Sequence, residues 1–185
     1  MNPAPAAAFQ GVFGAFSHEA CLQALPDYVP TPFDSFEAVF AAVSQGLCAR
    51  AVLPLENSIA GPVPEVTRLL PTSGLEVLRE HSLPIRLQLL GLPGASLSDA
   101  RTAESHPMAL GQCRRALADL RLRAVDSFDT AGAACAVAAA GDPARTAVAS
   151  RTAAALYGLR ILSADIEDAG DNRTRFVILS RPAGG

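Results

Sequence analysis

The stretch that decides the fold class is RAVDSFDTAGAACAVAAAGDPARTAVASRTAAALYGLRILS, residues 123–163. It contains three apolar runs, each of a length suited to a buried strand: Arg123–Val125, Thr146–Ala149 and Ile161–Ser163. Between these runs lie two segments suited to helices, Thr130–Ala140 and Arg151–Tyr157. Strands that alternate with helices in this way predict an α/β fold with largely parallel sheets.

The same alternation extends toward both ends of the chain. Ser17 and Ser35 are placed to cap two helices, while Pro64 and Pro107 are suited to open two more, the last of which reaches Asp119. Further strands are predicted at Phe9–Val12, Ala51–Leu55, Glu76–His81, Arg86–Leu92, Thr102–Glu104 and Thr174–Leu179.

Composition excludes several classes of protein. The 185 residues are 50% apolar and 18% charged, which is typical of a soluble globular protein. A net charge of −3 does not indicate a protein that binds nucleic acid or an anionic membrane. No apolar run is long enough to span a membrane. The first six residues lack the basic start and apolar stretch of a signal peptide, and prolines at positions 3 and 5 favour a flexible start. We therefore expect a cytoplasmic protein.

The four cysteines lie far apart, at positions 21, 48, 113 and 135. They form no C-x-x-C pair and no Cys/His cluster at the spacing of metal ligands. We expect four reduced thiols that serve mainly in packing, and no metal site.

Two breaks in the pattern suggest hinges, one at residues 81–84 and one at residues 164–170. With both as hinges, residues 1–82 and 164–185 would build a first lobe and residues 83–163 a second. The cleft between such lobes would be the default ligand site.

One stretch of polar residues directly follows a predicted buried strand. Glu56, Asn57 and Ser58 come after the apolar run at residues 51–55, where loops at the carboxyl ends of parallel strands present ligand groups. Asn and Ser also favour plain turns, so a turn with a solvated glutamate fits the same residues.

Three other stretches admit a ligand-binding and a structural interpretation. Ser105, as a helix cap, would leave backbone N–H groups free for a carboxylate, with Gln112 two turns along; a capped amphipathic helix fits equally. Arg175 at a strand start could bind a carboxylate through two parallel hydrogen bonds, although arginine at a strand edge is common. The glycine-containing loop at residues 10–18 could cradle an anion or simply be a loop.

In order and spacing, these four stretches resemble the catalytic domain of prephenate dehydratase, from about Phe9 to Arg181. The family patterns G-x-x-G-T-F-S-H, P-x-E-N-S-x-x-G-x-V, S-H-P-Q-A-L-x-Q-C, A-x-x-Y-G-L and N-x-T-R-F are similar to residues 11–18, 54–63, 105–113, 154–159 and 172–176. The sequence departs from the family at Ala15, where the family has threonine, and at Met108, where it has glutamine.

The resemblance implies conversion of prephenate to phenylpyruvate in phenylalanine biosynthesis, with loss of water and carbon dioxide and no cofactor. It implies that Thr174 donates a hydrogen bond to the leaving hydroxyl. A proton relayed from water or from Glu56 is a variant of this mechanism. The substrate-binding residues implied are Ser17, Asn57, Ser58, Ser105, Gln112, Arg175 and Phe176.

The resemblance also implies the two-lobed fold of type 2 periplasmic binding proteins and a homodimer. Only nine residues follow Phe176, so we expect neither the family's ACT domain nor phenylalanine feedback through it. Two alternatives stay open: arogenate dehydratase, acting on the amino analogue, and a two-lobed protein that binds a small molecule without catalysis.

Overall fold

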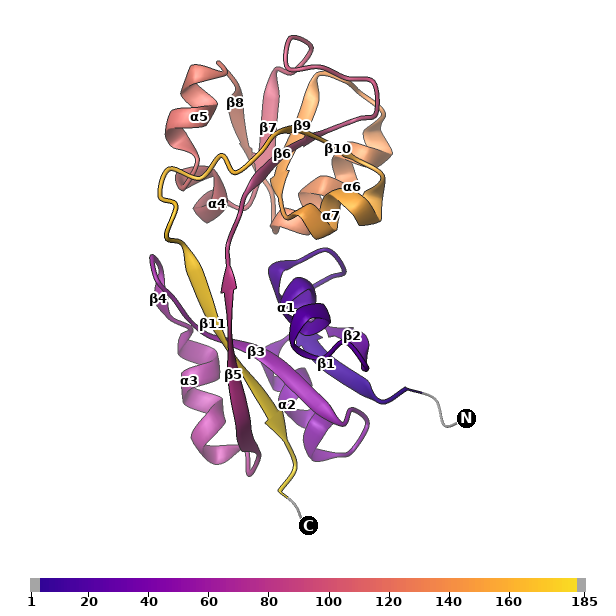
Figure 1. The fold of residues 1–185 in the computed structure, drawn as a ribbon, viewed down its shortest axis with the longest axis vertical. Coiled ribbons are helices and arrows are strands. Elements are labelled where there is room, and N and C mark those ends of the chain that lie inside the picture. Colours follow the sequence, from indigo (N-terminus) through magenta and orange to yellow (C-terminus); the bar gives the residue numbers. More distant parts are fainter. Residues whose placement is uncertain (1–3, 183–185) are drawn as a thin grey trace. The chain divides into compact units, whose positions relative to one another are not determined.

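A computed structural model describes residues 4–182, which form two compact units (Figure 1). Unit 1 comprises residues 4–12, 16–84 and 171–182, and unit 2 comprises residues 13–15 and 85–170. The flexible start expected at Pro3 lies outside the described residues. Each unit has its own sheet and its own helices, which confirms the α/β class predicted from the alternating pattern.

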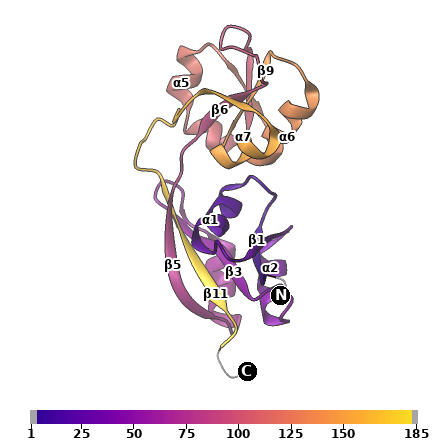
Figure 2. The same cartoon turned by 45° about the vertical axis from the view of Figure 1, so that its right-hand side comes forward.

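Unit 1 is built on a sheet in the order β2-β1-β3-β11-β5, with β4 paired to β3. Its strands are β1 (Ala6–Gln10), β2 (Val29–Phe33), β3 (Arg50–Asn57), β4 (Gly61–Pro62), β5 (Glu76–Pro84) and β11 (Arg173–Ser180). β1 runs parallel to β2 and β3, whereas β11 runs antiparallel to β3 and β5. β5 and β11 lie side by side as two long strands (Figure 2). The last strand of the sequence is therefore an interior strand of this sheet.

The helices of unit 1 include α2, whose start at Ser35 agrees with the prediction. The helical segments are α1 (Phe16–Ala24), α2 (Phe36–Ser44), α3 (Pro64–Leu69) and a 3₁₀ turn (Leu70–Thr72). The Ser35 hydroxyl accepts from the backbone N–H of Ala38 at 3.1 Å, which caps α2. Val39 and Val43 of α2 are fully buried in one core with Leu53 of β3, which fixes this helix against the sheet.

Unit 2 is built on a second sheet, in the order β10-β6-β9-β7-β8. Its strands are β6 (Gln88–Gly91), β7 (Thr102–Ser105), β8 (Arg123–Asp126), β9 (Arg145–Ala149) and β10 (Arg160–Ser163). Its helices are α4 (Pro107–Gly111), α5 (Arg114–Asp119), α6 (Thr130–Ala140) and α7 (Arg151–Tyr157). β7 runs parallel to β8 and β9, and β6 runs antiparallel to β9 and β10.

The boundaries of α6 and α7 agree with the prediction because both helices carry local start and stop signals. Asp129 Oδ1 accepts from the backbone N–H of Gly132 at 2.6 Å, and α6 ends at Gly141 in the left-handed conformation, with φ of 63°. The Ser150 hydroxyl accepts from Ala153 N at 2.9 Å and starts α7. These caps lie within the stretch from which the fold class was predicted.

The prediction of largely parallel sheets is wrong, because both sheets are mixed. In unit 1, β11 runs antiparallel to β3 and β5, and in unit 2, β6 runs antiparallel to β9 and β10. Alternation of strands and helices predicts parallel pairs only between strands that follow each other through a helix. It says nothing about a strand that returns from the far end of the sequence.

Two further differences have local causes. β2 lies outside the predicted strands and contains Pro30 and Pro32. It is at the edge of its sheet, where missing N–H groups are tolerated. The single helix predicted from Pro107 to Asp119 is two helices, because fully buried Cys113 leaves the helical conformation with φ of −120° and ψ of 19°.

None of the helices in residues 4–182 has the length and apolar character that crossing a membrane requires.

The thiols differ sharply in expected reactivity. All four cysteines are unpaired; Cys135 is exposed and the other three are buried. Burial raises the pKa of Cys21 and of Cys113 to about 12, so at pH 8 only about one molecule in 10⁴ carries either thiolate. A colorimetric thiol titration of the folded protein is expected to show one fast equivalent, which Cys135→Ser removes. A fast equivalent that survives this substitution would contradict the described packing.

Candidate active site

Two polar segments that are far apart in the sequence meet in unit 1. Thr174 and Asn57 are paired residues in the ladder between β11 and β3. The side-chain Nδ2 of Asn57 donates to Thr174 Oγ1 at 2.9 Å and to Asn172 Oδ1 at 2.8 Å. Thr174 is 8% exposed and Asn172 is 1% exposed, so these hydrogen bonds are largely shielded from water. We call Asn57, Asn172 and Thr174 the Asn-Thr cluster.

The Asn-Thr cluster has a defined direction of hydrogen bonding. The Oδ1 of Asn57 accepts from the backbone N–H groups of Ile59 and Ala60, both at 3.0 Å, so its nitrogen faces Thr174. A threonine hydroxyl has one hydrogen to donate and two lone pairs. One lone pair of Thr174 Oγ1 accepts the hydrogen bond from Asn57. Within residues 4–182 the hydroxyl hydrogen of Thr174 has no acceptor. The side chain of Thr174 is therefore a hydrogen-bond donor available to a ligand.

Glu56 lies outside this cluster. Its carboxylate accepts from Arg175 at 2.7 Å, and Arg175 also donates to Glu80 at 2.9 Å. The hydrogen bond to Glu56 raises the pKa of the Arg175 guanidinium. Glu56 precedes Asn57 on β3, and Arg175 follows Thr174 on β11. Neighbouring residues of a strand point to opposite faces of the sheet. The predicted residues thus separate into two groups, one on each face.

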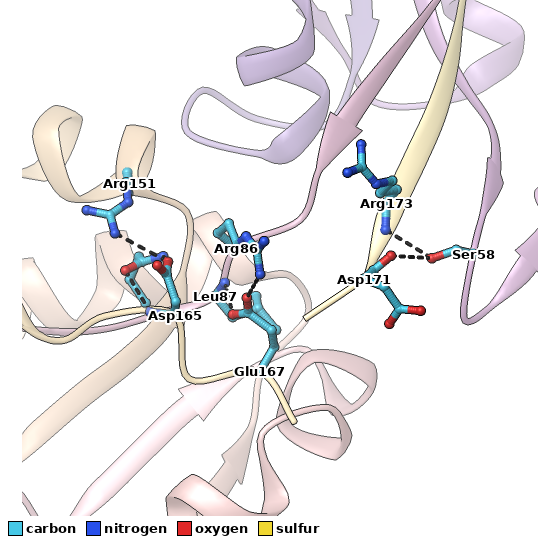
Figure 3. Close-up of polar contacts among 9 residues, drawn as sticks. Ser58, Arg86, Leu87, Arg151, Asp165, Glu167, Asp171 and Arg173 are labelled. Carbon is cyan, nitrogen blue, oxygen red and sulfur yellow. Dashed lines mark hydrogen bonds and ion pairs between the residues drawn. The ribbon is translucent and has the colours of Figure 1, made fainter. Parts of the chain in front are cut away.

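Ser58 joins the loop after β3 to the start of β11. Its hydroxyl accepts from the backbone N–H of Arg173 at 3.0 Å and donates to the carbonyl of Asp171 at 3.3 Å (Figure 3). Both interactions are local tethers to the segment that carries Thr174. The guanidinium of Arg173 is exposed, and in the described part of the chain it has no hydrogen-bond or ion-pair partner.

The prediction that Ser105 caps a helix is wrong. Ser105 is fully buried, and its hydroxyl donates to the carbonyl of Val148 at 2.6 Å. The cap of α4 is His106, whose Nδ1 accepts from the backbone N–H of Met108 at 3.1 Å. The residue before a proline is held in an extended conformation, and Pro107 therefore places the cap at His106.

Gln112 ends α4 instead of lying within a continuous helix. Its backbone carbonyl accepts from Asp168 N at 2.6 Å. A groove of about 360 Å³ lies nearby in unit 2, but neither Ser105 nor Gln112 lines it.

Two further predicted residues occupy positions that differ from the expectation. Ser17 lies inside the first turn of α1, which begins at Phe16, so it is not the cap. Phe176 is 1% exposed, in the interior of unit 1. Its burial assigns it to packing within this unit.

Phe13 and Gly14 of the glycine-containing loop belong to unit 2 and contact the segment of α7 in the same unit. Gly14 has φ of 92°, and a side-chain carbon there would come within 3.2 Å of Ala153. Its carbonyl accepts from the Ser150 hydroxyl at 2.7 Å, and the Tyr157 hydroxyl donates to the Phe13 carbonyl at 2.8 Å. Glycine at this position is explained by backbone conformation and close packing, without an anion.

One feature missing from the sequence-based predictions is that the acidic segment at residues 165–167 is anchored to residues 86–88, at the start of β6. Gln88 Nε2 donates to Asp165 Oδ1 at 2.7 Å, and Glu167 accepts from Arg86 at 2.8 Å and from Leu87 N at 2.9 Å (Figure 3). The hydrogen bond from Gln88 lowers the pKa of Asp165. The carboxylates at 165 and 167 were the available signal, although acidic loops are common.

Over residues 7–184 the sequence matches the family described as prephenate dehydratase. The chain belongs to this family. A bifunctional N-acyl-homoserine lactone acylase/prephenate dehydratase from Komagataeibacter europaeus is 46% identical over 98% of this chain and 64% of its own length. Arogenate dehydratase/prephenate dehydratase 1, a chloroplastic protein of Arabidopsis thaliana, is 42% identical over 94% of this chain and 44% of its own length.

The prephenate dehydratase fold is confirmed by a solved structure. The crystal structure of prephenate dehydratase from Arthrobacter aurescens, in complex with L-Phe, has a TM-score of 0.88 at 30% identity and covers 97% of this chain and 61% of that one. This chain thus spans less than two thirds of the length of each of these relatives.

Within this prephenate dehydratase family member, the motifs at residues 54–63 and 172–176 form the Asn-Thr cluster, both in unit 1. The motif at residues 105–113 belongs to unit 2, and the expected cleft stays a prediction. Among the described residues, no three histidine, cysteine, aspartate or glutamate side chains are grouped to hold a metal ion.

Proposed function

We propose that this chain converts prephenate to phenylpyruvate, with Thr174 as the hydrogen-bond donor to the leaving oxygen. The observation that carries this proposal is the hydrogen bond from Asn57 to Thr174 Oγ1, which leaves the Thr174 hydrogen directed elsewhere. A threonine hydroxyl is a weak acid at neutral pH, so its contribution is a hydrogen bond that strengthens as charge develops on the substrate oxygen.

The reaction is balanced without an oxidant or reductant. The bond between the ring and its carboxylate breaks and releases carbon dioxide, and its electron pair moves into the ring. The bond from the ring to the hydroxyl oxygen breaks on the opposite side, and the ring becomes aromatic. Hydroxide leaves, next to the Thr174 hydroxyl, and takes a proton from solvent to give water. A charge of −2 on prephenate becomes −1 on phenylpyruvate and −1 on hydroxide.

The pairing of Arg175 favours Arg173 as the guanidinium that attracts the substrate dianion. A carboxylate that approached Arg175 would meet Glu56 and Glu80, which already neutralise it. We expect Arg173→Gln to raise KM about tenfold, the effect of losing one modest charged hydrogen bond, and Arg175→Gln to raise KM less than about threefold. Steady-state kinetics of this matched pair check the assignment. A larger rise for Arg175→Gln would return the role to Arg175.

The remaining site residues and properties are proposals of the same kind. Ser17, Ser58, Ser105, Gln112 and Phe176 would shape or support the substrate site, Ser58 through its tethers and Ser105 and Phe176 through packing. We also propose a cytoplasmic homodimer that needs no cofactor.

Arogenate is the second candidate substrate, because the Arabidopsis relative carries both activities in its name. Purified protein would be assayed with prephenate, with arogenate, and with an N-acyl-homoserine lactone, since the Komagataeibacter relative is also named an acylase. Phenylpyruvate from prephenate at the higher kcat/KM supports the proposal. A higher kcat/KM with arogenate reassigns the substrate, and binding without any turnover identifies a sensor.

A further inference from the structure

The amide nitrogen of Asn57 meets more acceptors than it has hydrogens. Nδ2 lies 2.8 Å from Asn172 Oδ1, 2.9 Å from Thr174 Oγ1 and 3.1 Å from the carbonyl of Arg173. An amide nitrogen carries two hydrogens. Which two of the three acceptors receive them decides whether Thr174 accepts a hydrogen bond.

The opposite end of the same amide is fixed. Oδ1 of Asn57 accepts from two backbone N–H groups, those of Ile59 and Ala60, in the turn after β3. A flipped amide would place NH₂ against these two donors and its oxygen against the carbonyl oxygens of Asn172 and Arg173, which cannot donate. The Asn57 amide therefore has one orientation, with Oδ1 toward the turn, and only the exact direction of its two N–H bonds depends on other contacts.

Asn172 supplies the nearest of the three acceptors. It is 1% exposed and lies directly before β11, two residues ahead of Thr174. We propose that Asn172 is a positioning residue: its carbonyl takes one hydrogen of Asn57, and the geometry of the NH₂ group then directs the other at Thr174 Oγ1. Thr174 is thereby kept as a donor toward the leaving oxygen.

Without this acceptor, the carbonyl of Arg173 is the remaining partner of the other amide hydrogen, and the plane of the Asn57 amide turns toward it. The hydrogen bond to Thr174 Oγ1 then loses the direction that Asn172 sets. This inference rests on the proposed function. Asn172→Ala is expected to lower kcat about tenfold and to leave KM within about twofold, because the hydroxyl acts mainly in the transition state. In this proposal Asn172 acts through the Asn57 amide and is not itself a catalytic residue.

The test is a double-mutant cycle between Asn172→Ala and Thr174→Ala, with thermal unfolding recorded for every variant. If Asn172 acts through the Thr174 hydroxyl, the double variant has the kcat of Thr174→Ala within about twofold. A further tenfold loss in the double variant, or a single Asn172→Ala variant with kcat within about twofold of wild type, would overturn the inference.

Ser180→Ala is the matched control. Ser180 is also a buried polar residue of the same segment, 4% exposed at the far end of β11, with hydrogen bonds to Glu76 and to the Arg181 carbonyl. It is expected to change unfolding without changing kcat. Equal losses of kcat in Ser180→Ala and Asn172→Ala would reduce the role of Asn172 to stability and overturn the inference.

A second readout separates this inference from the proposed function. The Asn57 side-chain amide protons, assigned by their loss in Asn57→Ala, should exchange slowly with solvent in wild type and in Ser180→Ala, and rapidly in Asn172→Ala. Absence of turnover in wild type would refute the proposed function alone. Unchanged exchange in Asn172→Ala would refute the positioning role alone.

Discussion

Thr174→Ala is expected to lower kcat for prephenate by about 10²- to 10³-fold, the range seen when one donor to a developing oxyanion is removed. KM should change little, because the hydrogen bond to the substrate oxygen strengthens only as the carbon-oxygen bond breaks. Phenylpyruvate formation followed by absorbance gives both constants.

Two variants define what a positive result means. Thr174→Ser keeps a hydroxyl and should retain kcat within about tenfold of wild type. Glu56→Gln tests the relayed proton, and since Glu56 pairs with Arg175 on the other face of the sheet, its loss of kcat should stay below about tenfold. A loss in Glu56→Gln equal to that in Thr174→Ala would restore Glu56 as the proton source.

Asn57→Asp is expected to be as harmful as removal of the Thr174 hydroxyl, with kcat lowered about 10²- to 10³-fold. The substitution keeps the shape of the side chain and the oxygen that accepts from Ile59 and Ala60. It replaces the donor nitrogen by a carboxylate oxygen, which only accepts hydrogen bonds. The Thr174 hydroxyl would then donate to residue 57 and have no hydrogen for the substrate.

Asn57→Ala is the comparison that isolates this reversal. It removes the partner of Thr174 without offering a new acceptor, so kcat should fall only about tenfold. Circular dichroism and thermal unfolding would show that both variants fold. The interpretation fails if Asn57→Ala loses as much kcat as Asn57→Asp, because direction of hydrogen bonding would then not be the cause.

The sequence predicted the members of the site better than their arrangement. Glu56, Asn57 and Ser58 read as one polar triplet, yet a β-strand sends successive side chains to opposite faces. The pairing of Asn57 with Thr174, and of Glu56 with Arg175, follows from the register between β3 and β11. That register is a contact between distant segments, which no local pattern specifies.

Other misses have equally specific causes. Asn172 is not among the predicted site residues, because its role depends on burial beside Asn57, a contact between distant segments. β2 contains two prolines, which are unfavourable in a strand away from a sheet edge. Pro107 holds the preceding residue in an extended conformation, so His106 and not Ser105 is the cap. The elements that were placed correctly, α6 and α7 above all, carry their own start and stop signals.

The position of β11 between β3 and β5 has a consequence for how the chain folds during synthesis. The sheet of unit 2 is encoded without interruption by residues 88–163 and can close while the chain is still being made. In unit 1, until the strand at residues 173–180 has been made, β3 has an unpaired edge and β5 has no partner strand in the described sheet. Such long-range pairing is slow and leaves the nascent chain open to association with others. The segment that ends this vulnerable period is the one that brings Thr174 to Asn57, so nascent unit 1 acquires its last strand and its proposed reactive hydroxyl together.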